Sequence, residues 1–194
     1  LSVAGRAFSR PDYTAAAARA ADFVLKNLWN ENTLARAWRK GACSGPGFLE
    51  DYAAVAIAVL DVLESENRAA WREAAREMLT QMVARFRDPV TLAFASSGAE
   101  HGVALARMHD VFDQAMPSAT SLAIEALHRG SIALKEPAWL DHARAAAAAT
   151  LPRTARMPSG CCALLHAARA LPGKLPPPPP SGPACEGDDC VMPL

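Results

Sequence analysis

Helical segments that are apolar on one side alternate along this chain with segments that are apolar almost all round. A one-sided apolar stripe is typical of a half-exposed helix, and uniform apolarity is typical of a helix covered by neighbours. The alternation predicts an all-α fold in which half-exposed helices form an outer layer around buried helices. The half-exposed segments are 11–28, 70–86 and 137–151, and the buried segments are 48–63, 117–134 and 158–171.

Composition and internal repetition favour the same architecture. Alanine is abundant and only 6% of residues are aromatic, which suits closely packed helices better than a β-sandwich. The sequence around Trp71 resembles that around Trp139, and Met116-Pro117-Ser118 recurs as Met157-Pro158-Ser159. We therefore expect residues 1–171 to form three helical hairpins of an α/α toroid. Because repeat units bury their faces against neighbours, three hairpins leave open ends, and the chain is expected to be a piece of a larger ring.

The composition changes after Leu171, where five consecutive prolines begin at Pro176. Proline has no backbone N–H and adopts extended polyproline geometry, so residues 172–194 are expected to form a disordered proline-rich tail. A spacer and a ligand for a proline-motif-binding partner are the two interpretations of this run. Cys185 and Cys190 lie in the same tail, and their spacing is compatible with a small disulfide or with a metal site.

Charge and motif content exclude several classes of function. Twenty basic residues balance twenty acidic ones, so we expect neither nucleic acid nor a membrane surface as a partner. No apolar run approaches the length of a membrane span, and no targeting segment is visible. The five cysteines have no framework spacing, which favours a reducing, cytoplasmic location. Phosphate-loop, zinc and nucleophile-elbow motifs are absent, so no metal or cofactor is expected.

Candidate site residues cluster just before the apolar segments, where free backbone N–H groups and the positive end of the helix dipole attract acceptors. Two carboxylates in one cavity would suit sugar chemistry, and Asp51 and Asp113 are the catalytic candidates. The alternative for both is helix capping, which is also the alternative for Ser118. The binding candidates are Trp38, Glu50, Tyr52, Arg107, Asp110 and Ser118.

Three motifs, taken together, resemble a known family. They are Ser44-Gly-Pro-Gly-Phe-Leu-Glu-Asp-Tyr-Ala, then Arg107-x-x-Asp110-x-x-Asp113-x-x-x-Pro117-Ser118, then Cys185-x-x-x-x-Cys190-x-x-Pro193. In this order they resemble the C-terminal toroid of the spermatogenesis-associated, thioredoxin-like protein family. Members of that family carry an N-terminal thioredoxin-like domain and a toroid similar to six-hairpin glycosidases and sugar 2-epimerases.

The resemblance implies a six-hairpin glycosidase-like toroid with a carbohydrate as ligand. We expect no activity from this chain alone, and a glycosidase- or epimerase-like reaction if the parent protein is an enzyme. A non-enzymatic helical-repeat scaffold with a proline-rich interaction tail is the alternative. The chain departs from the family pattern in lacking the thioredoxin-like domain, in the proline-rich stretch after Leu171, and at two positions. Thr120 stands where the family favours Asn, and Met116 stands where a polar residue is expected.

Overall fold

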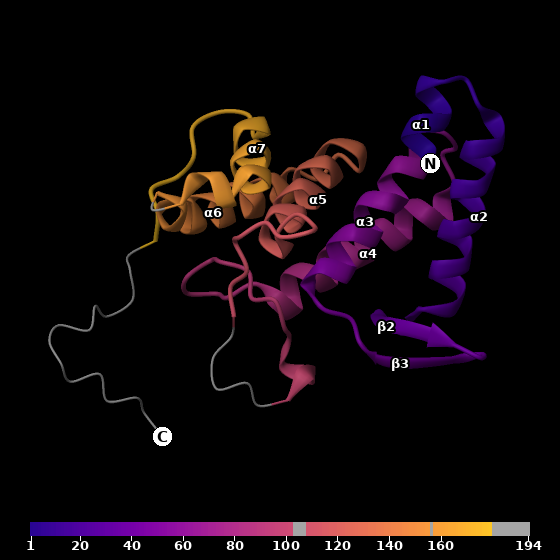
Figure 1. Ribbon diagram of the computed structural model, residues 1–194, viewed down its shortest axis with the longest axis horizontal. Helices are drawn as coiled ribbons and strands as arrows, with labels where there is room; N and C mark the ends of the chain where they lie inside the picture. The colour runs from indigo at the N-terminus through magenta and orange to yellow at the C-terminus, as the bar shows by residue number, and fades with distance from the viewer. Residues whose placement is uncertain (103–107, 156, 180–194) are drawn as a thin grey trace, which may run out of the picture.

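The computed structural model describes residues 1–102, 108–155 and 157–179 (Figure 1). Within these ranges the chain is mostly helical, and one small sheet follows the second helix. The α-helices are α1 (Ser2–Ala7), α2 (Pro11–Asn27), α3 (Leu49–Leu63), α4 (Ala69–Phe86), α5 (Ala119–Ala133), α6 (Pro137–Thr154) and α7 (Cys162–Ala170), with short 3-10 turns at Ala99–His101 and Pro158–Gly160.

The helices form two layers. Helix α5 packs between α3 and α7, while α2 and α4 pack on α3, and α6 packs on α5 and α7 (Figure 1). The inner helices are more buried, as the apolar pattern predicts: α2 buries only Ala21, whereas Tyr52, Ala56 and Val59 of α3 are inaccessible or nearly so. Helix α3 is nevertheless not covered on every side, because Ala54 and Ala58 are exposed. The mostly helical class is therefore confirmed for the described residues, whereas Val55 and Leu122 are only half-buried, as Arg72 and Arg76 are.

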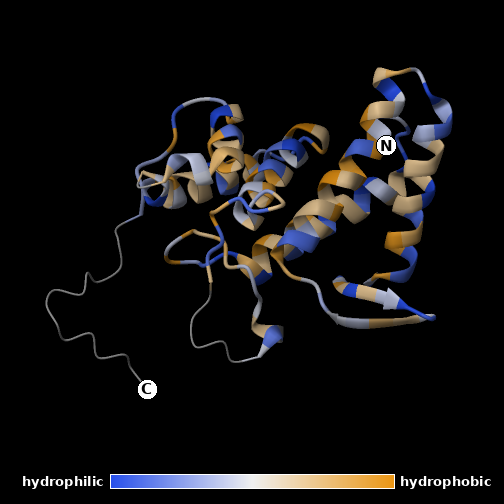
Figure 2. Cartoon of the chain, in the orientation of Figure 1, coloured by the Kyte–Doolittle hydropathy of each residue, from blue (hydrophilic) through white to orange (hydrophobic). Residues whose placement is uncertain are grey.

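The expectation of a purely α-helical chain is wrong between α2 and α3. Three antiparallel strands lie there in the order β1 (Trp29–Asn30), β2 (Thr33–Arg39) and β3 (Ala42–Pro46). The β2–β3 turn uses positive φ at Lys40 and Gly41, and the tip of this hairpin is hydrophilic (Figure 2). Sequence patterning missed the hairpin because most of its residues are exposed, so no apolar face alternates along it. The short helix α1 was also missed.

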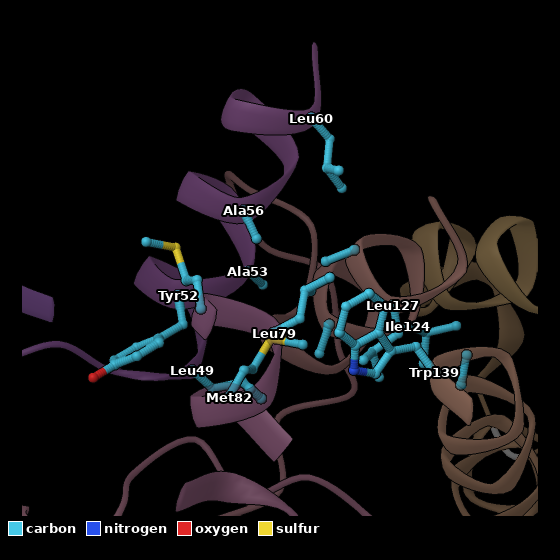
Figure 3. Close-up of a cluster of buried hydrophobic side chains, with 14 of the residues drawn as sticks. Leu49, Tyr52, Ala53, Ala56, Leu60, Leu79, Met82, Ile124, Leu127 and Trp139 are labelled. Carbon is cyan, nitrogen blue, oxygen red and sulfur yellow. The ribbon is translucent and has the colours of Figure 1, made fainter. Parts of the chain in front are cut away.

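The core lies where α3, α4, α5 and α6 meet. Leu79 and Met82 of α4 face Ile124 and Leu127 of α5, and Trp139 of α6 closes the cluster (Figure 3). All five side chains are buried. Close packing of this kind, rather than helix propensity, supplies most of the stability of such helices.

The end of the described chain only partly fits the expected tail. Residues 174–179 have no regular secondary structure. Leu175 nevertheless packs against the core, and the guanidinium of Arg144 donates to the carbonyl of Pro172. The first residues after α7 therefore still contact the helical body. Residues 180–194, with Cys185 and Cys190, lie outside the described residues.

Candidate functional site

Helices α3, α5 and α7 begin at the same end of the molecule. Asp113 accepts hydrogen bonds from the amide of Ser118, at the start of α5, and from the amide of Ala163, in the first turn of α7. Glu50, in the first turn of α3, lines the same pocket as Pro117, just before α5. The starts of these three helices therefore lie close together. Their positive dipole ends converge on this region, which we call the N-terminal mouth.

A pocket of about 240 Å³ opens at the N-terminal mouth. Two carboxylates and a primary amide supply hydrogen-bonding groups, and the remaining walls are aromatic or aliphatic. Such a mixture suits a ligand that has both hydroxyl groups and an apolar face. The lining residues are Glu50, Asp110, Phe112, Gln114, Ala115, Met116 and Pro117.

Asp51 holds local structure together at the mouth. Its carboxylate accepts from the backbone N–H of Phe48 at 2.9 Å and pairs with the guanidinium of Arg36 at 2.7 Å. The first contact caps α3, because Phe48 is the residue that precedes the helix. Asp51 does not line the pocket. Of the two roles that the sequence leaves open for Asp51, capping is the one that the geometry provides.

Arg36 joins the β2–β3 hairpin to the mouth. One of its terminal nitrogens, Nη1, lies 2.9 Å from Glu50 and 2.7 Å from Asp51, and hydrogen bonding to Glu50 is the main cause that raises the pKa of Arg36. The guanidinium also lies 4.6 Å from the centre of the Phe48 ring, and that ring lies 4.1 Å from the ring of His101. Arg36 is not among the predicted site residues, because the sequence pattern does not predict the strand that carries it.

Asp113 and Ser118 are likewise committed to capping. Both carboxylate oxygens of Asp113 accept backbone amides, at 3.0 Å from Ser118 and 2.8 Å from Ala163. Ser118 is 1% exposed, and its Oγ accepts from the amide of Ser121 in the first turn of α5. Asp110 accepts from the amide of Ala119 at 3.3 Å and, unlike Asp113, also lines the pocket.

The other candidates do not join the pocket. Tyr52 is 0% exposed, and its hydroxyl accepts from the amide of Leu34, so its place is in the core. Trp38 packs edge-to-face on Phe23 of α2, with the ring centres 5.3 Å apart. Arg107 lies outside the described residues. The structure therefore brings Glu50 and Asp110 together on one pocket and assigns Tyr52 to packing.

The described residues provide neither a candidate metal site nor a candidate membrane-spanning helix. They contain no cluster of three or more His, Cys, Asp or Glu side chains that could hold a metal ion. None of the helices in these ranges is long and apolar enough to cross a membrane. Cys161 is a buried free thiol beside Asp113, and burial raises its pKa, while Cys43 and Cys162 are exposed free thiols.

Comparison with known proteins gives one partial similarity. The chain is 34% identical over 113 residues to spermatogenesis-associated protein 20 of Mus musculus. This stretch is 58% of the present chain but only 14% of the mouse protein, so the chain spans a small part of that relative. No family model matches the sequence. The similarity is distant, and it supports a relationship to spermatogenesis-associated protein 20.

Proposed function

We propose that this chain is an arc of an α/α toroid similar to six-hairpin glycosidases, and that its N-terminal mouth binds a carbohydrate through Glu50 and Asp110. The observation that carries the proposal is the pocket shared by these two carboxylates, which come from the first turn of α3 and from the loop before α5. The distant similarity to spermatogenesis-associated protein 20 supports the family, and the toroid is the fold that the sequence motifs imply.

The pocket chemistry suits a sugar. Carboxylate and amide groups, here Glu50, Asp110 and Gln114, can accept hydrogen bonds from ligand hydroxyls. Phe112 and Met116, which are both exposed, offer apolar surface for the C–H face of a sugar ring. Met116 takes the place of an expected polar residue, so this surface is more apolar than the family pattern implies.

An open apolar groove supports the interpretation that further helices complete the ring. It has a volume of about 260 Å³ and runs along α2 and α3, where Ala17, Ala20, Val24, Val55 and Ala58 line it. Small aliphatic side chains allow close approach of another helix, and exposed apolar surface is unfavourable unless something covers it. A further hairpin of a longer parent protein would cover the groove.

In this proposal, catalysis requires the longer parent protein. Asp51 and Asp113, the sequence-based catalytic candidates, use their oxygens for helix caps and an ion pair. Glu50, whose Oε1 pairs with Arg36, and Asp110, whose Oδ2 accepts from the amide of Ala119, are the carboxylates that line the pocket. A glycosidase- or epimerase-like reaction would then act at this pair, and the present chain would bind without turnover.

A ligand-observed NMR screen of monosaccharides and oligosaccharides tests the proposal. Glu50→Gln and Asp110→Asn should each weaken binding of any sugar that is found, by about tenfold, which corresponds to the loss of one charged hydrogen bond. Asp141→Asn is the matched control, because Asp141 is 77% exposed in its side chain and lies on α6 away from the pocket. Equal binding by the two pocket variants and the wild-type chain would refute the assignment of this pocket.

A non-enzymatic helical-repeat scaffold is the second candidate. The specific observation in its favour is that Asp51, Asp113 and Ser118 all act as caps, so the mouth can be a structural joint without a ligand. Under this alternative the proline-rich segment that begins at Pro176 binds a proline-motif-binding partner. Failure of every sugar in the screen would favour the scaffold.

A further inference from the structure

We propose that an exposed aromatic and basic surface, built by α2 and the tip of the β2–β3 hairpin, binds an acidic segment of a partner protein. This surface is separate from the pocket at the N-terminal mouth, and the proposal does not depend on sugar binding. We call it the hairpin–α2 surface, and its residues are Arg19, Phe23, Lys26, Trp38, Arg39 and Lys40.

An exposed aromatic pair lies at its centre. Phe23 is 46% exposed and Trp38 is 39% exposed, and their rings meet at an angle of 84° with the centres 5.3 Å apart. The contact fixes the hairpin tip against α2, and the thiol of Cys43, which donates to the carbonyl of Asn27 at 2.8 Å, adds a second attachment. Two large aromatic rings that remain this exposed provide apolar contact area of the kind that anchors protein interfaces.

Four exposed cations lie near the pair in sequence. Arg19 and Lys26 lie one helical turn before and after Phe23 on α2, and Arg39 and Lys40 follow Trp38 at the hairpin tip. All four side chains are exposed, and none of them forms an ion pair with any residue in the described ranges.

The β2–β3 hairpin itself carries no acid that could balance these charges. The stretch 32–49 contains no Asp or Glu. Asp22, the immediate neighbour of Phe23, is engaged by Arg68 at 3.0 Å and by the indole N–H of Trp71 at 2.7 Å. A chain with no net charge therefore concentrates positive charge here, which is the electrostatic complement of an acidic partner.

The aromatic geometry favours a peptide over single-stranded nucleic acid. Nucleic acid binding of this kind uses open ring faces on which successive bases stack. In the perpendicular arrangement of Phe23 and Trp38, the edge of one ring covers a face of the other, so two open parallel faces are not available. A peptide segment can supply carboxylates that pair with the cations and one apolar side chain that packs on the aromatic pair. Such a segment fits both the charge and the aromatic geometry of this surface.

A fluorescence-anisotropy titration with a labelled random glutamate–tyrosine copolymer tests the proposal. The wild-type chain should bind, with affinity that falls as salt increases. The double variant Arg39→Glu/Lys40→Glu and the single variant Trp38→Ala should each weaken binding by about tenfold or more. The control Lys135→Glu/Arg169→Glu reverses two exposed cations elsewhere and should bind like the wild type.

Two results would overturn the proposal. Equal weakening by the control would show that the copolymer binds any cation, and unchanged binding by Trp38→Ala would show that the aromatic pair makes no contact. A single-stranded oligonucleotide that displaces the copolymer and binds more tightly in a Trp38-dependent manner would identify nucleic acid as the partner instead. Circular dichroism and the urea midpoint of each variant show whether the hairpin substitutions leave the fold intact.

Discussion

The carboxylate of Asp113 accepts a hydrogen bond from the backbone amide of Ala163 at 2.8 Å, across 50 residues of sequence. The other oxygen of the same carboxylate accepts from the amide of Ser118. One side chain therefore caps the starts of both α5 and α7. This contact fixes two inner helices at a common end and leaves Glu50 and Asp110 to face the pocket beside them.

Asp113→Ala should lower the free energy of unfolding by about 1–3 kcal/mol, because it removes an acceptor from two helix starts at once. Urea denaturation followed by circular dichroism measures this loss. Asp141→Ala is the control, since its side chain is 77% exposed and should change stability little. Equal stability of the two variants would mean that the double cap has no energetic role.

Tyr52→Phe should destabilise the chain by about 1–3 kcal/mol, because the buried amide of Leu34 would lose its acceptor. The ring itself would remain packed against Phe86. Hydrogen exchange of the Leu34 amide is the specific readout and should become faster relative to other slowly exchanging amides. An unchanged Leu34 exchange rate would contradict the proposed link between β2 and α3.

Gly130→Ala should be destabilising even though alanine is the better helix former. A Cβ at Gly130 would overlap Cδ1 of the buried Leu79, where α4 crosses α5. Overpacking of a tight core costs about 1–3 kcal/mol, which exceeds the gain in helix propensity of about 0.5–1 kcal/mol.

Leu79→Ala provides the test of that contact, because it makes room for the new methyl group. In the double variant Gly130→Ala should no longer be destabilising, and a double-mutant cycle measures the coupling. Additive effects of the two substitutions would show that α4 and α5 do not cross at these residues.

The pH dependence of stability should include a contribution from Asp88. Its Oδ1 accepts from the amides of Thr91 and Val90, and these bonds, that of Thr91 foremost, lower the pKa of the Asp88 carboxyl. Because the folded pKa lies below the unfolded one, the ionised carboxylate favours the folded state. The stabilisation is complete at neutral pH and is lost as the pH falls below about 4.

Asp88→Asn isolates this contribution, since the amide oxygen can still accept but does not titrate. The wild-type chain should be more stable than the variant at neutral pH, and the difference should shrink in acid. Thermal unfolding of both chains over a pH series gives the comparison. A difference that stays constant with pH would contradict the lowered pKa.

Periodicity predicted the long helices because their burial follows a simple geometric pattern. Helix α4 has Trp71, Ala75, Met78 and Met82 on one face, and all four are buried as expected. Proline at the first helical position also located the start of α2 at Pro11. The β2–β3 hairpin could not be found in this way, because its exposed residues carry no burial signal.

The site was predicted in outline only. Sequence position placed Glu50, Asp51, Asp110 and Asp113 near helix starts, but it could not show which of these carboxylates line the pocket. That depends on partners far away in sequence, such as Ala163 for Asp113 and Arg36 for Asp51. Capping and ligand contact use the same residue types at the same positions, so only the three-dimensional arrangement separates them.

Chemical-shift mapping of a bound sugar on the ¹⁵N-labelled chain is the most direct test of the proposed mouth. One ligand should shift amides at both Glu50 and residues 110–116, because the first turn of α3 and the loop before α5 share one pocket. The amide of Trp38 should not shift. Perturbation confined to only one of these segments, or centred on the β2–β3 hairpin, would contradict the claim that Glu50 and Asp110 form a single carbohydrate site.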